Sequence, residues 1–302
     1  MRSPKMAPEK PIPSTAVTIG TFDGVHLGHQ TLLKRAHGHA QSRGFSSVAL
    51  TFRRPPQNEL GHPKPLLLPP EEKLKLLAEH VDRVGVLDFQ EIRHLTPEAF
   101  VDQILHHTYN AQVVVTGSDF RFGRDRSGDV DVLRSLGAEY GIEVEIIAPV
   151  DASDQPISSS AIRHLLREGN VRAAAELMGR PPRLVGQVVS GAGEGKRIGY
   201  PTANLRVDPE VLVPADGIYA AWTNVGNGRH PSALYIGKRP TYNAQERSIE
   251  VHLLDGPTRS LRDDTLMVEL VEQVRPDERF ESVEALKAQI AADLDKVRGV
   301  LS

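Results

Sequence analysis

The sequence predicts an α/β domain followed by an all-β domain that ends in a helix. From residue 16 to about residue 178, short apolar runs alternate with helical patterns, as in a parallel sheet built from βαβ units. After the break Gly-Arg-Pro-Pro at residues 179–182, the apolar runs are separated by glycine and proline, which is typical of a small antiparallel barrel. A length of 302 residues also suits two domains of ~150 residues each.

The first domain is expected to span residues 15–182. Its helices follow from apolar side chains at helical spacing, such as Leu33, Ala36 and Ala40, and from start signals such as Thr96-Pro97-Glu98, which offers a capping hydroxyl, a first-turn proline and an acid. The predicted strands are short runs rich in apolar or β-branched residues, at 16–20, 47–52, 84–89, 112–116 and 143–147.

The second domain is expected to span residues 183–302. Residues 280–297 form an amphipathic helix with Val283, Leu286, Ile290 and Leu294 on one face. Residues 1–14, with three basic residues and four prolines but no apolar core, are interpreted as a disordered leader rather than a secretory signal. The predicted barrel strands are residues 185–189, 217–222, 232–236, 249–254 and 266–271.

Composition excludes several classes of protein. A net charge of −3 disfavours a dedicated nucleic-acid-binding protein. The absence of cysteine excludes disulfides, thiolate metal sites and a cysteine nucleophile, and it fits a reducing compartment. No run of apolar residues is long enough to span a membrane.

A glycine-rich segment with two histidines joins the first predicted strand to the first predicted helix. Residues 20–29 read Gly-Thr-Phe-Asp-Gly-Val-His-Leu-Gly-His. A helix N-terminus suits phosphate, and Gly24 and Gly28 let the backbone approach a ligand closely. His26 and His29, three residues apart, could both face one anion, although such pairs also occur on surfaces or bind metals. The nearby His37 and His39 lie within the helical pattern and are interpreted as surface residues.

Three later segments offer further candidate site residues. Residues 117–123 follow a strand and contain paired aromatics, which could line a site for a flat ring or simply fill the core. Residues 157–163 begin a helix with three serines, which by residue type predict an N-cap. Residues 191–205 form a glycine-rich loop that leads into Pro-Thr-Ala-Asn, where Thr202 and Asn204 offer hard oxygen ligands for Mg²⁺.

His-x-Gly-His directly after Gly-x-Phe-Asp-Gly resembles the nucleotidylyltransferase signature. From about residue 15 to its end, the chain resembles the prokaryotic bifunctional riboflavin kinase/FAD synthetase family. The resemblance implies a Rossmann-like FMN adenylyltransferase domain at 15–182 and a Greek-key β-barrel riboflavin kinase domain at 183–302. It is carried by the segments at 20–29, 117–129, 157–163, 179–181, 199–205, 214–219, 237–241, 250–255 and 275–280.

The resemblance implies a cytoplasmic enzyme with two ATP-dependent activities. One phosphorylates riboflavin to FMN, and the other adenylylates FMN to FAD with release of pyrophosphate. The expected ligands are riboflavin, FMN, FAD and ATP, with Mg²⁺ as cofactor and with neither nucleic acid nor membrane as a partner. The expected state is a monomer or a weak homo-oligomer.

The resemblance also implies roles for particular residues. Glu250 would be the kinase base, and because it interrupts an apolar strand pattern it is either such a base or a solvent-facing strand residue. His26, His29 and Arg163 would act in adenylyl transfer, and Thr202 and Asn204 would bind Mg²⁺. Flavin would contact Asp119, Phe120, Phe122 and Arg275. ATP or its phosphates would contact Gly20, Phe22, Asp23, Gly24, Gly28, Ser158, Ser159, Gly191, Gly195, Lys196, Gly199 and Pro201.

The chain departs from the family pattern at three places. Thr-Phe-Arg-Arg-Pro-Pro at 51–56 lacks the histidine and one proline of Thr-Phe-x-Pro-His-Pro, Tyr235 replaces an asparagine, and Leu261-Arg262-Asp263 replaces a Leu-Tyr-Gly turn. The alternatives are therefore a riboflavin kinase without the second activity and a non-catalytic flavin-binding sensor. A flavin reductase linked to NAD(P) is disfavoured because no Gly-x-Gly-x-x-Gly opens a helix after a strand.

Overall fold

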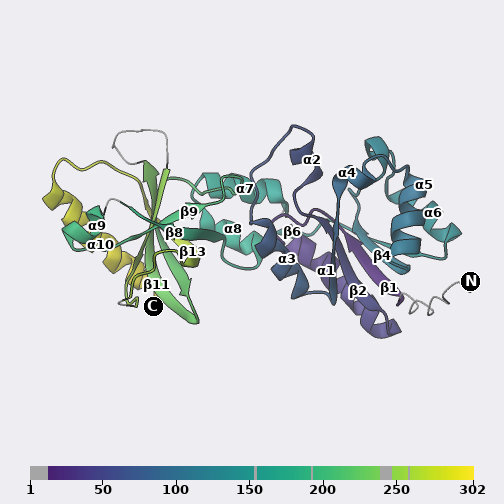
Figure 1. The fold of residues 1–302 in the computed structure, drawn as a ribbon, viewed down its shortest axis with the longest axis horizontal. Helices are drawn as coiled ribbons and strands as arrows, with labels where there is room; N and C mark the ends of the chain where they lie inside the picture. The colour runs from purple at the N-terminus through teal and green to yellow at the C-terminus, as the bar shows by residue number, and fades with distance from the viewer. Residues whose placement is uncertain (1–12, 153–154, 192, 239–246, 258) are drawn as a thin grey trace, which may run out of the picture. The chain divides into compact units, whose positions relative to one another are not determined.

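The computed structural model describes residues 13–152, 155–191, 193–238, 247–257 and 259–302. All but the last two residues of the predicted leader lie outside this part of the chain. Contacts divide the molecule into two compact units, one made of Met1–Lys64 and Pro70–Pro156 and the other of Pro65–Pro69 and Ile157–Ser302 (Figure 1).

The first unit is built on a parallel sheet, as the alternating pattern predicts. Its strand order is β3-β2-β1-β4-β5, so the order reverses between β1 and β4. In such sheets ligands bind beyond the carboxyl ends of the strands at this reversal. The bounds of the strands lie within two residues of the predicted ones: β1 Thr15–Ile19, β2 Ser46–Phe52, β3 Arg83–Leu87, β4 Ala111–Gly117 and β5 Glu143–Ile147.

Helices cover both faces of this sheet, and the main ones begin and end at the expected residue types. Helix α1 (Leu27–Arg43) ends at Gly44 in the left-handed conformation, and α5 (Pro97–Ala99) begins at Thr96, whose hydroxyl accepts from Ala99 N. The latter start confirms the prediction, although the helix continues as a π-helix. The other elements are α2 Pro56–Glu59, α3 Pro70–Ala78, α4 Phe89–Ile92, η1 Phe100–Thr108, η2 Arg124–Arg126, α6 Val130–Glu139, and the short pair β6 Asp151–Ala152 and β7 Gln155–Pro156.

Two apolar layers hold the sheet in place, because successive residues of a strand point to opposite faces. On one face, Ala16 and Val113 pack with Ala36 and Ala40 of α1. On the other face a larger cluster packs around Phe100. The sheet is thus covered on both sides, and the loops at its edges are what is left for ligands.

The second unit contains a closed antiparallel barrel, which confirms the predicted second fold class. Its strand order is β10-β11-β12-β9-β8-β13. Five strands match the predicted runs, whereas β9 was not predicted, because residues 201–204 were interpreted only as a metal-binding loop. The strands are β8 Arg183–Val189, β9 Ala203–Val207, β10 Gly217–Val225, β11 Gly228–Lys238, β12 Arg247–Leu253 and β13 Thr265–Pro276.

Two helices that precede the barrel in sequence belong to its compact unit. Ile162 and Leu166 of α7 (Ser159–Arg167) and Met178 of α8 (Val171–Met178) share one apolar cluster with residues of the barrel interior. The division by contacts therefore falls at residue 157. The boundary expected between residues 182 and 183 stays a prediction.

Two further helices complete the second unit. The single-turn α9 (Glu194–Ile198) lies within the glycine-rich loop, and α10 (Val283–Leu301) ends the chain. Helix α10 packs Leu294 and Val297 against the barrel, but Val283 at its start is 52% exposed, so the predicted apolar face is used only from its middle onward. In the described residues, no helix is long and apolar enough to cross a membrane.

Two candidate active sites

The loop after β1 has an unusual backbone that its burial holds in place. Phe22, Gly24 and Val25 have positive φ angles of 49°, 83° and 41°, a backbone conformation that residues other than glycine seldom adopt. Phe22 is fully buried, and Val25 N donates to its carbonyl at 3.0 Å. Such conformations persist only where the surroundings enforce them, and they cluster at functional sites.

The two histidines of this loop lie against each other at the start of α1. His26 is the N-cap, and its Nδ1 accepts from His29 N at 3.4 Å. The two rings stack with centroids 3.6 Å apart and 19° between their planes, and Phe22 meets His29 edge-on at 5.3 Å. The two rings therefore lie together at the helix start, and their facing a common anion stays a prediction.

This arrangement suits an anion. Because Nδ1 of His26 accepts a hydrogen bond, the neutral ring has its proton on Nε2, where it can donate to a ligand. The helix N-terminus adds its dipole and further N–H groups. In the described part of the chain, the three side chains close enough together to bind one metal ion are Asp102, His106 and His107. His26 and His29 are not among them.

A buried lysine beneath this loop was missed at the level of sequence. Lys73 of α3 is only 3% exposed, and its Nζ donates to the carbonyls of Thr21 at 3.2 Å, Phe52 at 2.5 Å and Arg53 at 3.4 Å. Burial lowers the pKa of Lys73 to about 8, while Asp23 raises it and Arg53 lowers it. In the sequence, Lys73 is one lysine of a charged helix start, so no local signal distinguishes it from Lys75.

The aromatic segment after β4 is partly core. Phe122 is 6% exposed and packs on Phe100. Phe120 stacks on Phe122, with the ring centroids 5.5 Å apart and 11° between the ring planes. Asp119 is exposed beside them. The interpretation of this segment as core filling therefore describes the Phe122 ring, and a flavin contact of Asp119 and Phe120 stays a prediction.

The serines and the arginine at the start of α7 lie in the second unit. Ser158 is its N-cap and accepts from Ala161 N at 3.2 Å, which confirms the capping prediction. Arg163 is buried, and its Nε donates to Pro65 O at 2.7 Å. A role of Ser158, Ser159 and Arg163 in binding phosphates stays a prediction.

The barrel brings residues that are distant in sequence into one row. The register pairs Asn204 with Glu250, Glu250 with Tyr235, Tyr235 with Ile218, and Ile218 with Arg275. Directly opposite residues of antiparallel strands share a face. Since their neighbours along the strands fill the barrel interior, this row lies on the outer face.

Glu250 lies at the centre of a group of hydroxyl and amide side chains. Its carboxylate accepts from Thr202 Oγ1 at 2.8 Å and from Ser248 Oγ at 3.0 Å. A Cβ added to Gly191 would collide with the Asn204 amide, and one added to Gly195 would collide with the carbonyl of Tyr200. The glycine loop therefore lies directly on the predicted metal ligands, at a distance that only glycine permits.

The donor atoms of this group fit a hard divalent cation. Thr202 uses its hydroxyl proton on Glu250, so its oxygen lone pairs remain for another ligand. Asn204, opposite Glu250, adds an amide oxygen. Hydroxyl, amide and carboxylate oxygens are the ligands that Mg²⁺ prefers, so the residue types expected from the sequence lie together here.

The remaining predicted nucleotide ligands lie around the same loop. Pro201 O accepts from Nδ1 of His252 at 2.8 Å, and Gly199 ends α9 with a φ of 99°. Lys196 is exposed on α9. Of the glycines in this loop, Gly195 lies next to Thr202: a Cβ added to it would stand 3.0 Å from the Thr202 hydroxyl.

Tyr235, which departs from the family pattern, adds a weakly acidic phenol beside Glu250. Its hydroxyl donates to Asp277 Oδ2 at 3.4 Å. Burial raises the pKa of Tyr235 to about 12, and the negative charges of Asp277 and Glu250 act in the same direction. Burial, together with Asp216, raises the pKa of Asp277.

Arg275, expected to contact flavin, is held within the protein. Its guanidinium forms a bidentate ion pair with the buried Asp293 of α10, with Nε 3.0 and 3.1 Å from the two carboxylate oxygens. It also lies 5.5 Å from the Phe280 ring. These contacts give Arg275 a structural role, and flavin contact stays a prediction.

The other departures have local solutions. Asp263 takes a φ of 68°, and Asp264 N donates to Leu261 O at 3.0 Å, so the Leu-Arg-Asp sequence forms a turn as expected. At the first departure, Pro55 is the N-cap residue of α2 and Pro56 is a proline of its first turn. Residues 239–241 of the Gly-Lys-Arg-Pro-Thr segment lie outside the described residues.

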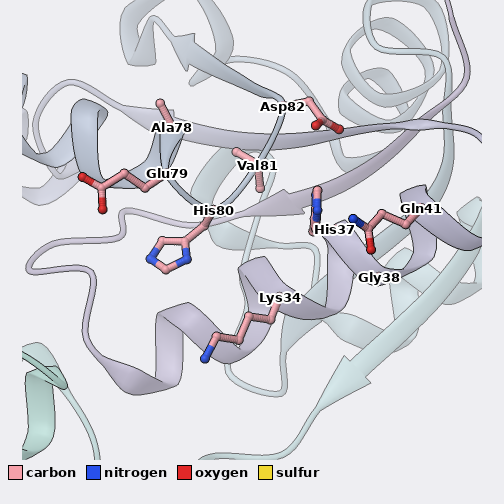
Figure 2. Close-up of a pocket in the computed structure, with 9 residues that line it drawn as sticks. All are labelled: Lys34, His37, Gly38, Gln41, Ala78, Glu79, His80, Val81 and Asp82. Atoms are coloured by element: carbon pink, nitrogen blue, oxygen red, sulfur yellow. The ribbon is translucent and has the colours of Figure 1, made fainter.

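A cavity of about 470 Å³ lies between α1 and the segment that joins α3 to β3, and none of its lining residues belongs to either candidate site (Figure 2). His37, one of its lining residues, contacts Ser47 Oγ through Nδ1 at 3.0 Å, and Ser47 donates to Asp82 at 2.7 Å. His39 pairs with Glu145 at 2.5 Å. His37 and His39 are therefore half-buried and tie α1 to the sheet, which corrects their interpretation as plain surface residues.

Comparison with known proteins gives the same order of domains. The family model for FAD synthetase matches residues 9–161, and that for riboflavin kinase matches residues 178–301. The bifunctional riboflavin kinase/FMN adenylyltransferases of Pseudomonas fluorescens and Escherichia coli are 36% and 34% identical, each over 94% of this chain and 92% of their own.

A solved structure shares the fold over both domains. It is described as a macrolide-efflux protein from Streptococcus pneumoniae, is 32% identical, and has a TM-score of 0.85 over 95% of this chain and 94% of its own. The sequence resemblance and the predicted fold class are therefore confirmed. The chain belongs to the family of bifunctional riboflavin kinases/FMN adenylyltransferases, with an FAD synthetase domain before a riboflavin kinase domain.

Proposed function

We propose that riboflavin is phosphorylated on the outer row of the barrel, with Glu250 as the base. The ribityl hydroxyl is a weak nucleophile, and its oxygen must lose a proton as it attacks the γ-phosphorus of ATP. The carboxylate of Glu250 accepts this proton as the new P–O bond forms and ADP leaves. Thr202 and Ser248 donate to the carboxylate and so orient it.

Thr202 and Asn204 would hold Mg²⁺ next to this base. The ion would supply positive charge against the phosphates during transfer. The glycine loop that contains Gly191 and Gly195 would wrap the polyphosphate, with Lys196 as an additional cation. The observation that carries this proposal is the single group formed by Glu250, Thr202, Asn204 and Gly191.

Adenylyl transfer to FMN is proposed to take place at the loop after β1. A phosphate oxygen of FMN attacks the α-phosphorus of ATP, the bond to pyrophosphate breaks, and FAD forms. Since the nucleophile is already an anion, this step needs no base and depends on positioning and charge. The start of α1, His26 and His29 provide N–H donors there, and Gly20, Gly24 and Gly28 let the backbone approach.

The flavin ring of FMN is proposed to contact Asp119 and Phe120 after β4, since β1 and β4 flank the reversal of strand order. The support for His26 and His29 is their stacking at the helix start. A monomer or weak homo-oligomer in the cytoplasm stays the expectation that comes with the family.

One experiment tests both activities in the intact chain. Purified protein is incubated with riboflavin, ATP and Mg²⁺, and the flavins are separated by chromatography with fluorescence detection. We expect FMN first and FAD later, and no product when EDTA removes the metal. FMN alone would support a kinase without the second activity, and bound flavin without any product would support a sensor.

A further inference from the structure

Lys73 is a lysine buried under the adenylyl-transfer loop, where its amine binds backbone carbonyls. Its amine reaches three carbonyl oxygens, those of Thr21, Phe52 and Arg53, at 3.2, 2.5 and 3.4 Å. Thr21 belongs to the loop after β1, whereas Phe52 ends β2 and Arg53 follows it. One amine therefore joins the carboxyl ends of two neighbouring strands.

The hydrogen-bond partners of the amine suit its protonated form, whereas burial opposes the charge. An ammonium has three N–H donors and no acceptor, and three carbonyls surround it. Burying a charged group costs free energy unless hydrogen bonds compensate for it, so a lysine that is 3% exposed needs such a purpose. A neutral amine would keep two donors for three acceptors and would leave one carbonyl unpaired.

The carbonyl of Thr21 is the point at which this contact affects the backbone. Thr51 Oγ1 also donates to it at 3.2 Å, and Gly20 N donates to Leu50 O at 3.0 Å, so the loop is fastened to β2 just before its strained part. Phe22, Gly24 and Val25 follow with positive φ angles, and His26 then begins α1. A shift at Thr21 would move the start of the helix.

Charges around the amine balance one another. Asp23 of the loop after β1, also 3% exposed, raises the pKa of the amine, and Arg53, which follows β2, lowers it. Arg53 is in turn paired with Glu71 at the start of α3. At neutral pH the ammonium thus adds a positive charge beneath the loop where a triphosphate is expected.

We propose that Lys73 is a positioning residue for adenylyl transfer: its buried ammonium ties the loop after β1 to the end of β2 and so holds the start of α1 in the conformation that receives ATP. This inference rests on the function proposed for the loop. Lys73 touches backbone carbonyls, so it acts through the loop and not on the reacting atoms.

The test compares Lys73→Met with Lys75→Met in the full chain. Methionine is long and apolar and fits a buried site, whereas Lys75 is an exposed lysine on the same helix, paired with Glu72. For Lys73→Met we expect kcat/KM for ATP in adenylyl transfer to fall at least about tenfold, mainly through a higher KM. The KM for ATP in the riboflavin kinase reaction should stay within about twofold, and Lys75→Met should change neither value by more than that.

Hydrogen exchange separates a positioning role from a purely structural one. In Lys73→Met the amides of residues 20–26 and 53–54 should exchange faster, while those of β4 keep the protection of the wild type. Faster exchange throughout β4 would overturn the proposal, since Lys73 would then stabilise the whole unit. Unchanged exchange in the loop, or an unchanged KM for ATP, would overturn it as well.

His29→Ala, measured in parallel, distinguishes this inference from the function on which it rests. If His29→Ala keeps full adenylyl transfer, the proposed site itself is wrong. If His29→Ala loses the activity and Lys73→Met keeps it, the site stands and the role of Lys73 is wrong.

Discussion

The two units of this protein build their candidate sites in different ways. In the first unit the phosphate-binding part of the site consists of backbone and side chains of one continuous loop and the helix that follows it, with Lys73 buried beneath the loop. In the second unit it consists of side chains on neighbouring strands, with Asn204 and Glu250 paired by register. The phosphate-binding part of the first site is local in sequence, whereas the second site exists only once the barrel has closed.

This difference indicates how each site responds to change. A loop site depends on backbone conformation, so it is sensitive to whatever holds the loop, including residues that never touch the ligand. A strand site depends on register and on the space above the sheet, so it is sensitive to any atom added between the loop and the row. Because the two sites share no residue, each should fail alone.

The largest expected effect is the loss of Glu250. Replacing Glu250 with alanine removes the proposed base, and we expect FMN formation to fall about 10²–10⁴-fold. Conversion of FMN to FAD should be unchanged, because Glu250 and the two hydroxyls that donate to it, those of Thr202 and Ser248, belong to the second unit. Both rates are measured by flavin chromatography on the same preparation, and loss of both activities in a folded protein would refute the model of two independent sites.

His29→Ala should produce the converse result. Removing one imidazole from the helix start should lower adenylyl transfer by about 10²–10³-fold, the range seen when one preorganised donor is lost. Riboflavin kinase activity should remain at the level of the wild type. The matched control is His39→Ala, on the same helix but paired with Glu145, and an equal loss there would point to damage of the helix.

Raising the pH should stabilise the first unit of the wild type relative to Lys73→Met. The pKa of Lys73 is about 8 in the folded chain and 10.5 in the unfolded chain. Between these values the unfolded chain holds more protons, so the free energy of unfolding of the wild type rises with pH. The rise is at most about 1.4 kcal/mol per pH unit and up to about 3 kcal/mol in total.

Urea unfolding followed by circular dichroism at pH 7.5, 8.5 and 9.5 measures this difference. The single tryptophan, Trp222, lies in β10 of the barrel, so tryptophan fluorescence follows unfolding of the second unit. The urea midpoint measured by this fluorescence should be the same in the wild type and in Lys73→Met. A difference in stability that is independent of pH would show that the amine does not titrate in this range.

The smallest expected effect concerns the close approach of the glycine loop to Asn204 on the outer face of the barrel. Gly191→Ala places a methyl group on the Asn204 amide and should displace this ligand. We expect riboflavin kinase activity to fall about tenfold, with a higher requirement for Mg²⁺. Gly299→Ala, in α10 with open space around it, is the control, and an equal response of the two variants would remove Asn204 from the proposed metal site.

Local signals were sufficient for most elements of the fold. The apolar runs predicted all five strands of the sheet and five of the six barrel strands. A strand buried on both faces is a continuous apolar run, and a strand buried on one face alternates apolar and polar residues, so each can be recognised from its own segment. Thr96-Pro97-Glu98 and Ser158 were correct helix starts, because a cap is satisfied by residues three positions away. The stacking of His26 and His29 likewise follows from a spacing of three on one helix.

The features that the sequence did not predict depend on residues far apart in the chain. The strand β9 was overlooked because its pairing with β8 and β12 is not encoded in residues 203–207 themselves. The packing of Phe100 places the Phe122 ring in the core, and Asp293, on another element, forms an ion pair with Arg275. Neither contact is visible in the local sequence, and flavin contact of Arg275 stays a prediction.

The sequence by itself determined the two domains, their order, their fold classes and the motifs at the carboxyl end of the first strand, because periodicity, caps and glycine spacing act over a few residues. Only the tertiary structure decided that Glu250, Thr202 and Asn204 meet under Gly191, and that Lys73 lies beneath the loop at Thr21. The physical reason is that register and burial are set by pairing between segments far apart in the chain, so no single segment contains the information.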